Sequence, residues 1–252
     1  MQKNILIIPC YNEEKRLDTK VFLELAQCHG DIIFMFVNDG SKDNTRKILH
    51  ALSEAALNIT VLNLPQNVGK AEAVRQGVHT ALATYPEIPT LAFYDADLAT
   101  PFKDLNIMID KLLQEQLLMV IGCRFKRLGG NIDRRFGRFI LGRIFATIAA
   151  NILKLPVYDT QCGAKVFSYE IAQQIFKQPF YSRWLFDIEL FARIINIHGY
   201  PETIDRVVEY PLTSWKDIGG SKLKFSSILR QPINLLKIHR KYRKQLKAKR
   251  KC

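Results

Sequence analysis

The fold is decided by residues 90–97, Thr90-Leu91-Ala92-Phe93-Tyr94-Asp95-Ala96-Asp97, where an apolar run ends directly in two carboxylates. The apolar run predicts a buried strand. Side chains two positions apart on an extended segment point to the same side, so Asp95 and Asp97 can face one divalent cation, which prefers oxygen ligands. A solvated turn also favours Asp, and the pair by itself does not separate the two interpretations.

Apolar runs and helix-like segments alternate through the first half of the chain. Strands are expected at 4–8, 32–37, 59–64, 91–94 and 119–122, with helical patterns such as 71–82 between them. This alternation predicts an α/β protein with a doubly wound, mostly parallel sheet and helices on both faces. Such sheets bind ligands at the carboxyl ends of their strands.

Polar motifs follow four of these strands, and we expect one crevice to collect them. Asp39 offers a carboxylate that can accept from a base N–H or a ribose hydroxyl, and Gly40 permits a tight turn. Ser41, Asp43 and Asn44 can instead begin a helix as capping residues. The motifs are Pro9-Cys10-Tyr11-Asn12-Glu13-Glu14, Asn38-Asp39-Gly40-Ser41, Asn67-Val68-Gly69-Lys70 and Asp95-Ala96-Asp97.

Length and cysteine content describe a folded protein of a reducing compartment. The 252 residues are 48% hydrophobic, enough for one large α/β domain or two small ones. The five cysteines are scattered without paired spacing, and the apolar stretch 5–8 is strand-sized and ends at Pro9, unlike a signal peptide. We therefore expect a cytoplasmic setting.

Positive charge is concentrated at the C-terminus. The formal net charge is +13, and residues 237–252 contain nine Lys or Arg and no acid. Such a segment can bind anionic lipid headgroups, bind nucleic acid, or be a solvated, frayed helix end. The run 139–153 has one charge, Arg143, and is shorter than the roughly 20 residues that cross a bilayer, so it is a core helix or lies in the membrane interface.

The four motifs, in this order, resemble the family 2 glycosyltransferases of GT-A type. Three later motifs are similar to the dolichyl- or polyprenyl-phosphate glucosyltransferase branch, and the resemblance covers about residues 3–224. They are Asp159-Thr160-Gln161-Cys162-Gly163-Ala164-Lys165, Arg183-Trp184-Leu185-Phe186-Asp187-Ile188-Glu189-Leu190 and Gly220-Ser221-Lys222.

The resemblance implies a GT-A fold with C-terminal interface helices, Mg or Mn on Asp95 and Asp97, and catalytic roles for Asp97, Arg124 and Asp187. Residues 1–222 would form the catalytic domain, with 1–125 binding the nucleotide sugar and 126–222 the acceptor, and 223–252 a basic amphipathic tail. The implied donor-binding residues are Pro9, Tyr11, Asn12, Glu13, Asp39, Gly69, Lys70, Asp95, Ala96 and Asp97. Arg124, Arg134 and Arg138 would bind the acceptor phosphate, because a guanidinium binds phosphate oxygens in pairs.

The implied reaction moves a hexose from a nucleotide sugar to a polyprenyl or dolichyl phosphate with inversion, giving a β-linked product. Ala99 stands where the mannosyl branch usually has Gln, which favours glucose from UDP-glucose. A lipid monophosphate has a second pKa of about 6 and is largely a dianion at neutral pH, so it needs no strong base. The enzyme would be peripheral on the cytoplasmic face of the membrane, with a membrane partner subunit or a homo-oligomer as possible assemblies.

Two alternatives remain. A sugar hydroxyl as acceptor, in polysaccharide or glycolipid synthesis, would require a carboxylate base, for which Asp187 is the best candidate, although it can also serve a helix start. A nucleic-acid-binding protein would use the basic tail. We expect no nucleic acid partner, because the predicted crevice is acidic and repels phosphate backbones.

Overall fold

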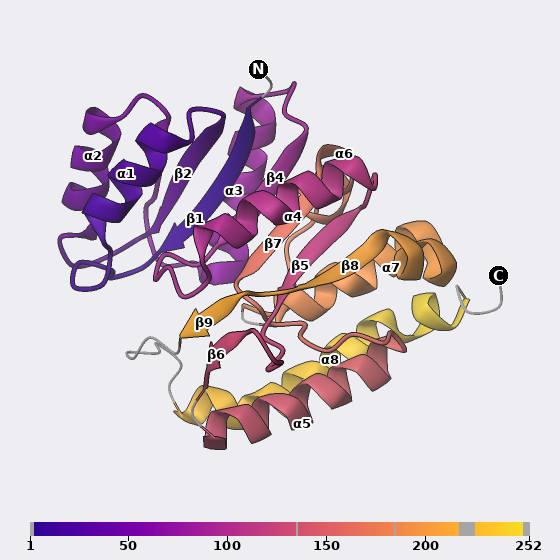
Figure 1. Cartoon of the computed structure of the whole chain (residues 1–252). Coiled ribbons are helices and arrows are strands. Elements are labelled where there is room, and N and C mark those ends of the chain that lie inside the picture. The colour runs from indigo at the N-terminus through magenta and orange to yellow at the C-terminus, as the bar shows by residue number, and fades with distance from the viewer. Residues whose placement is uncertain (1–2, 135, 184, 217–224, 249–252) are drawn as a thin grey trace. The chain divides into compact units, whose positions relative to one another are not determined.

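The computed structural model describes residues 3–134, 136–183, 185–216 and 225–248 (Figure 1). The chain divides into two compact units. Unit 1 comprises Met1–Leu98 and Gly163–Pro179, and unit 2 comprises Ala99–Cys162 and Phe180–Cys252. The expected functional halves, 1–125 and 126–222, stay a prediction.

Unit 1 is built on a mostly parallel sheet. Strand β1 pairs in parallel with β2 and β4, β2 pairs in parallel with β3, and β4 pairs antiparallel with β7. Its elements are β1 (Asn4–Cys10), α1 (Thr19–Cys28), β2 (Ile32–Asp39), α2 (Thr45–Ala55), β3 (Ile59–Leu64), α3 (Lys70–Thr84), β4 (Thr90–Tyr94), β7 (Ala164–Ser168) and α6 (Tyr169–Ile175). The four strands predicted in this region are confirmed as β1 to β4. Every residue of β2 and β4 is buried, as their apolar runs require.

Helices cover both faces of this sheet. Phe22 of α1 meets Phe36 of β2 edge to face, with ring centroids 5.0 Å apart. A Cβ added at Gly77 of α3 would lie 2.8 Å from methyl groups of Ile7 and Val37. Phe36 and Val37 are successive strand residues and point to opposite faces, so α1 and α3 lie on opposite sides. The doubly wound arrangement is therefore confirmed.

Unit 2 combines two short parallel strand pairs with long helices. β5 pairs with β8, and β6 pairs with β9. Its elements are α4 (Phe102–Gln114), β5 (Met119–Cys123), β6 (Asn131–Asp133), α5 (Phe136–Leu153), α7 (Phe186–Arg206), β8 (Val207–Pro211), β9 (Ser214–Lys216) and α8 (Phe225–Ala248). The predicted strand at 119–122 is β5, and the predicted apolar helix at 139–153 is the greater part of α5.

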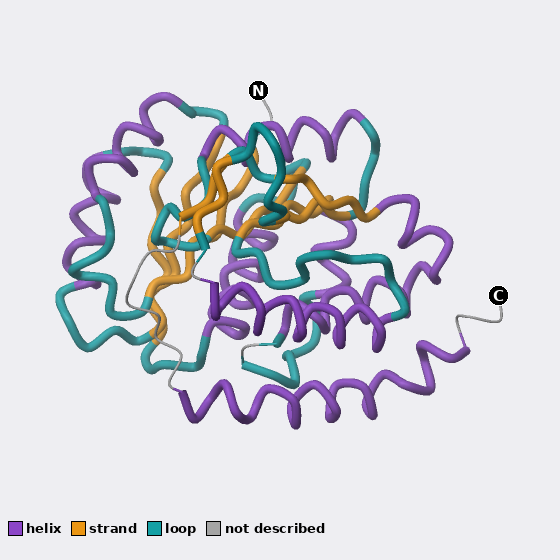
Figure 2. The backbone as a smooth tube through the Cα atoms, turned by 60° about the horizontal axis from the view of Figure 1, so that its bottom comes forward, coloured by secondary structure: helices purple, strands orange, loops and turns teal. Residues whose placement is uncertain are grey.

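The basic C-terminal region is a packed helix over Phe225–Ala248. Its buried side chains recur at helical spacing, and its exposed face is basic. The Tyr242 hydroxyl donates to Glu189 of α7 over 3.1 Å. Figures 1 and 2 both show α8 running beside α5. The frayed-end interpretation is thus wrong for the described part of α8, whereas Gly220-Ser221-Lys222 and residues 249–252 lie outside the described residues.

None of the helices in the described ranges is both long enough and apolar enough to cross a membrane.

The close packing of α3 generates a stability prediction. Gly77→Ala adds a methyl group against Ile7 and Val37, so we expect a net loss of about 1–2 kcal/mol in the free energy of unfolding, despite about 1 kcal/mol gained in helix propensity. Gly30→Ala is the matched control, because a Cβ at Gly30 meets nothing within 4 Å. Urea titration measures both variants. Equal stability of the Gly77 variant and the wild type would contradict this packing.

Candidate functional site

The parallel strands of unit 1 bring the predicted motifs to one edge of the sheet. Cys10 at the end of β1 is paired with Asn38 near the end of β2, and Ile7 of β1 with Phe93 of β4. The loops after β1, β2 and β4 therefore leave the sheet in the same direction, at its carboxyl edge.

The loop after β1 is fastened to the loop after β2. Asn12 has φ of 53°; its backbone N–H donates to Ser41 Oγ over 3.0 Å, and its side-chain oxygen accepts from the Lys42 N–H over 2.8 Å. The Glu13 N–H donates to Thr45 Oγ1 over 2.7 Å. Asn12 and Glu13, predicted as donor-binding residues, thus also hold the shape of this edge.

Asp39 is buried and binds the third motif. Its carboxylate accepts from the backbone N–H groups of Val68 and Gly69 over 2.7 and 2.9 Å, and from the Asn67 side-chain amide over 2.9 Å. Gly40, next to Asp39, has φ of 59°. A Cβ at Gly40 would overlap the backbone of Gln66 and Asn67, in the loop that Asp39 binds. The expected contact of Asp39 with a nucleotide stays a prediction, and its contact with residues 67–69 was not predicted.

Asp95 and Asp97 lie in a tight turn after β4, which we call the acidic turn (residues 95–97). Lys70 at the start of α3 donates to Asp95 Oδ1 over 2.5 Å, and the Asp95 N–H donates to the carbonyl of Gly163 over 3.0 Å. A Cβ at Gly163 would overlap the Asp95 carboxylate, so any larger residue there would move this side chain from its position. Ala96 is buried, whereas Asp95 and Asp97 are half-buried.

A cationic neighbour of the acidic turn was not predicted. Arg16 donates to Glu13 from Nε over 2.9 Å. Burial by itself would lower the pKa of Arg16, but the hydrogen bond and charge of Glu13, followed by the charges of Asp97 and Asp95, outweigh burial and raise it. The two aspartates therefore act on the Glu13–Arg16 pair, which joins the first and fourth motifs electrostatically.

The donor set of the acidic turn fits a hard divalent cation. Two carboxylates with accessible oxygens leave room for phosphate and water ligands, which is the pattern that Mg²⁺ and Mn²⁺ adopt with nucleotides. Among the described residues, groups of three or more His, Cys, Asp or Glu able to hold a metal are absent. Asp95 and Asp97 would therefore supply the protein ligands, and the remaining oxygens would come from a substrate and water.

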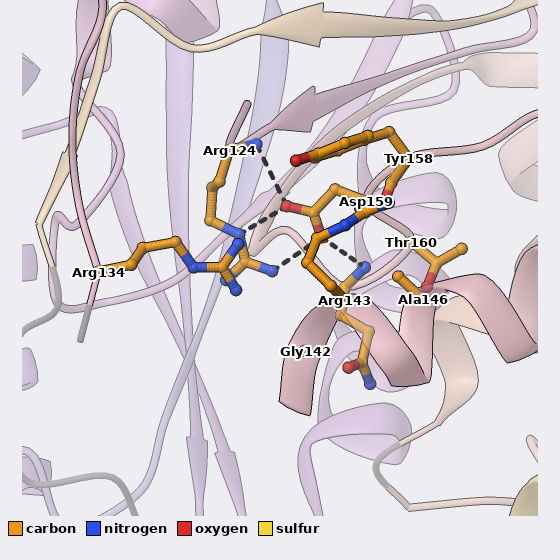
Figure 3. A pocket seen from close by; sticks show the side chains of 9 residues that line it. Arg124, Arg134, Gly142, Arg143, Ala146, Tyr158, Asp159 and Thr160 are labelled. Atoms are coloured by element: carbon orange, nitrogen blue, oxygen red, sulfur yellow. Dashed lines mark hydrogen bonds and ion pairs between the residues drawn. The ribbon is translucent and has the colours of Figure 1, made fainter. Parts of the chain in front are cut away.

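Unit 2 contains a separate site, which we call the arginine pocket (Figure 3). It opens to solvent, has a cavity volume of about 30 Å³ and is lined by Arg124, Arg134, Gly142, Arg143, Ala146, Tyr158, Asp159, Thr160 and Gln161. Three guanidinium groups and one carboxylate give this lining a net charge of about +2 at neutral pH.

Asp159 and Arg124 form a bidentate ion pair at one side of the pocket. Arg124 Nε and Nη2 donate to the two carboxylate oxygens over 2.7 and 2.8 Å, and the Arg124 backbone N–H adds a contact of 3.2 Å (Figure 3). Burial by itself would raise the pKa of Asp159. The charge of Arg124, its hydrogen bonds and the charge of Arg134 outweigh burial and lower this pKa from 3.8 to about 2.

Glu209 of β8 fixes the loop that carries Asp159. Its carboxylate accepts from the backbone N–H groups of Tyr158 and Asp159 over 2.8 and 2.6 Å. Burial and, after it, the charge of the same carboxylate raise the pKa of the Cys123 thiol and keep it protonated. No sequence pattern had singled out Glu209.

The other two arginines of the pocket are held by aromatic rings. Arg143 of α5 lies 3.5 Å from the centroid of the Tyr158 ring and donates to the Tyr158 carbonyl over 2.7 Å. Arg134 and Arg124 both lie against Trp215, at 5.8 and 5.2 Å. Burial and the charge of Arg124 lower the pKa of Arg134. In the described part of the chain, neither Arg134 nor Arg143 forms an ion pair with a carboxylate.

The residues predicted to act on the acceptor do not all line the arginine pocket. Arg124 and Arg134 line the arginine pocket, whereas the side chain of Arg138 lies outside the described residues. Asp187 is buried in the first turn of α7 and is not among the described residues that line the pocket. Arg143 does line it. Its sequence signal was a single charge within an apolar run, which was compatible with a core helix or an interfacial helix and did not indicate a pocket.

Comparisons with known proteins give one consistent result. The model of the family described as Glycosyl transferase family 2 matches residues 5–176. The dolichyl-phosphate beta-glucosyltransferase of Dictyostelium discoideum is 32% identical over 256 residues, which cover 94% of this chain and 74% of that protein. The protein of the same name from Homo sapiens is 30% identical, with 94% and 75% covered.

The fold recurs in a solved structure, glucosyl-3-phosphoglycerate synthase from Mycobacterium tuberculosis in complex with Mn²⁺, uridine-diphosphate-glucose and phosphoglyceric acid. The TM-score is 0.70 at 18% identity, with 94% of this chain and 80% of that chain covered. At this identity the similarity shows the GT-A fold that the sequence predicted.

The ion pair of Asp159 generates a pH-dependent prediction. Because folding lowers its pKa from 3.8 to about 2, the ionised carboxylate stabilises the folded state above about pH 4, and this contribution is lost as the pH falls through about 2. We expect Asp159→Asn to lower the free energy of unfolding at pH 7 by ~2 kcal/mol.

Urea titrations of the wild type and the variant between pH 7 and pH 2.5 measure this difference, which should shrink below about pH 4. The exposed Asp205→Asn serves as control and should show no such trend. A difference that stays constant across this range would contradict the assignment.

Proposed function

Because the chain belongs to glycosyl transferase family 2, we propose that it transfers glucose from UDP-glucose to the phosphate of a polyprenyl or dolichyl lipid, with inversion. The observation that carries the acceptor part of this proposal is the arginine pocket, whose net charge of about +2 matches a phosphate monoester dianion. The relatives named above, similar over 94% of this chain, support glucose as the sugar and dolichyl phosphate as the acceptor.

The donor is assigned to the loops of unit 1. The acidic turn would hold the diphosphate through a divalent metal ion, Mg²⁺ or Mn²⁺, which neutralises charge on the leaving group. Asp95 would then exchange its contact with Lys70 for the metal, and the Lys70 ammonium would remain beside the phosphates. The backbone of residues 67–69, held in place by Asp39, would form part of the wall of the nucleotide site.

The acceptor phosphate is assigned to Arg134 and Arg143, with Arg124 at the edge of the pocket. Burial and, after it, the charge of Arg124 lower the pKa of Arg134, and a bound anion would relieve this like-charge crowding. A dianionic phosphate oxygen is nucleophilic enough to attack the anomeric carbon without a strong base, so the chain mainly orients the acceptor and compensates charge. Displacement of UDP from the opposite side of the sugar would give the β anomer.

The membrane supplies the acceptor, and unit 2 has a face suited to it. Ile140, Ile144 and Ile148 of α5 are 41%, 54% and 46% exposed and recur every four residues, which places them on one stripe of the helix. The exposed face of the neighbouring α8 carries Lys237, Arg240, Lys241, Arg243, Lys244 and Lys247. An apolar stripe beside a basic face favours docking on an anionic membrane surface.

The enzymatic proposal generates a prediction about Asp97. Transfer of labelled glucose from UDP-glucose to a prenyl phosphate in detergent should require Mn²⁺ or Mg²⁺, and Asp97→Asn should reduce turnover roughly 100-fold or more, because the metal would lose one of its two protein ligands. GDP-mannose, assayed in parallel, tests the donor. The exposed Asp110→Asn should retain wild-type turnover.

Wild-type turnover that is unaffected by EDTA would contradict the metal assignment. Absence of lipid product with either donor, in a folded protein that binds UDP, would reject the lipid-phosphate acceptor and favour a hydroxyl acceptor with Asp187 as base.

Membrane docking generates a separate prediction. Ile144→Glu places a charge in the centre of the α5 stripe. We therefore expect the affinity for vesicles containing phosphatidylserine, measured by co-sedimentation, to fall at least about tenfold without loss of stability. Ile204→Glu is the control, since Ile204 of α7 is 51% exposed but lies outside the stripe. Equal vesicle binding by both variants would contradict the proposed face.

A further inference from the structure

We propose that Asp159 determines which phosphate the arginine pocket accepts, a monophosphate monoester in preference to a diphosphate. This inference rests on the proposed function only in taking the pocket as the site of the acceptor phosphate. It assigns to the carboxylate a role in specificity, in addition to its contact with Arg124.

Asp159 is saturated by protein donors. Oδ2 accepts from Arg124 Nε and the Arg124 backbone N–H, and Oδ1 accepts from Arg124 Nη2 and the Gln161 N–H. A carboxylate has about four lone-pair sites, so these bonds leave it no ordinary capacity to accept from a ligand. Its influence on a bound phosphate is therefore electrostatic and passes through Arg124.

The carboxylate is also fixed in charge and position. Its lowered pKa keeps it ionised at neutral pH. Glu209 anchors the backbone N–H of Asp159 over 2.6 Å, and the Asp159 side chain is buried. Asp159 therefore stays ionised at neutral pH when an anion binds. Moving its side chain would break several short hydrogen bonds.

The resulting charge count separates two classes of ligand. Pairing with Asp159 compensates Arg124, so Arg134 and Arg143 supply the uncompensated charge of about +2. A phosphate monoester carries about −1.5 to −2 at pH 7 and is matched by this charge. A diphosphate carries about one negative charge more, and among the described residues that line the pocket no further cation balances it against the ionised Asp159.

The experiment measures binding to the full-length protein of four probes, namely farnesyl monophosphate, farnesyl diphosphate, inorganic phosphate and pyrophosphate, by calorimetry at pH 7.5. We expect the wild type to prefer farnesyl monophosphate. Asp159→Asn removes one negative charge with little change in shape, and should shift the ratio of the two affinities toward the diphosphate by about tenfold or more.

Two variants separate electrostatics from loss of structure. Glu209→Gln loosens the same loop and removes a carboxylate that is not among the described lining residues, so both affinities should fall while their ratio changes far less than in Asp159→Asn. Asp205→Asn removes an exposed carboxylate of α7 and should change neither. The inorganic pair tests whether the preference belongs to the phosphate group or to the lipid: a parallel shift assigns it to the phosphate group, as proposed.

An unchanged affinity ratio in Asp159→Asn, or a shift confined to the farnesyl pair, would overturn the proposal while leaving glucose transfer to lipid phosphate intact. A wild type that transfers no glucose to prenyl phosphate and binds neither farnesyl probe would instead reject the acceptor site itself, and this inference with it.

Discussion

A loop that leaves a sheet edge must satisfy its own backbone N–H groups, and in this protein buried or half-buried carboxylates do so at several functional loops. Asp39 accepts from Val68 and Gly69, and Glu209 accepts from Tyr158 and Asp159. An unpaired buried N–H costs about 1–3 kcal/mol, so each carboxylate strongly favours one loop conformation. Two further carboxylates follow the same pattern. Glu189 accepts from the backbone N–H groups of Tyr181 and Ser182, and Asp104 accepts from the backbone N–H of Thr213.

This constraint explains why acidic residues outside the predicted acidic turn matter to the sites. Glu209 lies on β8, yet it positions the loop on which Asp159 holds Arg124. Glu189 lies inside α7 and also accepts from Tyr242, so it joins α8 to the segment that precedes Asp187. Carboxylates with such backbone contacts act as fixed charges, and their charges shape the sites beside them.

Local pattern was sufficient for β1 to β5, but it did not predict β7, β8 or most side-chain contacts. Apolar runs bounded by turn residues located the five strands of the first half, and strand ends located the acidic turn, because both signals depend on neighbouring residues. Glu209 and Asp159 are 50 residues apart, and no local pattern indicates that one will anchor the other. Arg143 was visible only as a charge in an apolar helix, and the packing of α8 depends on burial of Tyr242 against α7. The residues predicted to bind donor and acceptor stay predictions.

In the proposed reaction a phosphate oxygen of the lipid is the nucleophile, and the chemical structure of the product identifies this atom. Prenyl phosphate labelled with ¹⁸O in its phosphate group would be incubated with UDP-glucose, the metal and the wild-type protein, and the lipid product examined by mass spectrometry and ¹H NMR. We expect a β-glucosyl phosphate that retains all of the label, because the oxygen that joins the anomeric carbon to the diphosphate leaves with UDP. A product in which glucose is joined to a hydroxyl group, an α anomer, or label found in UDP would contradict it.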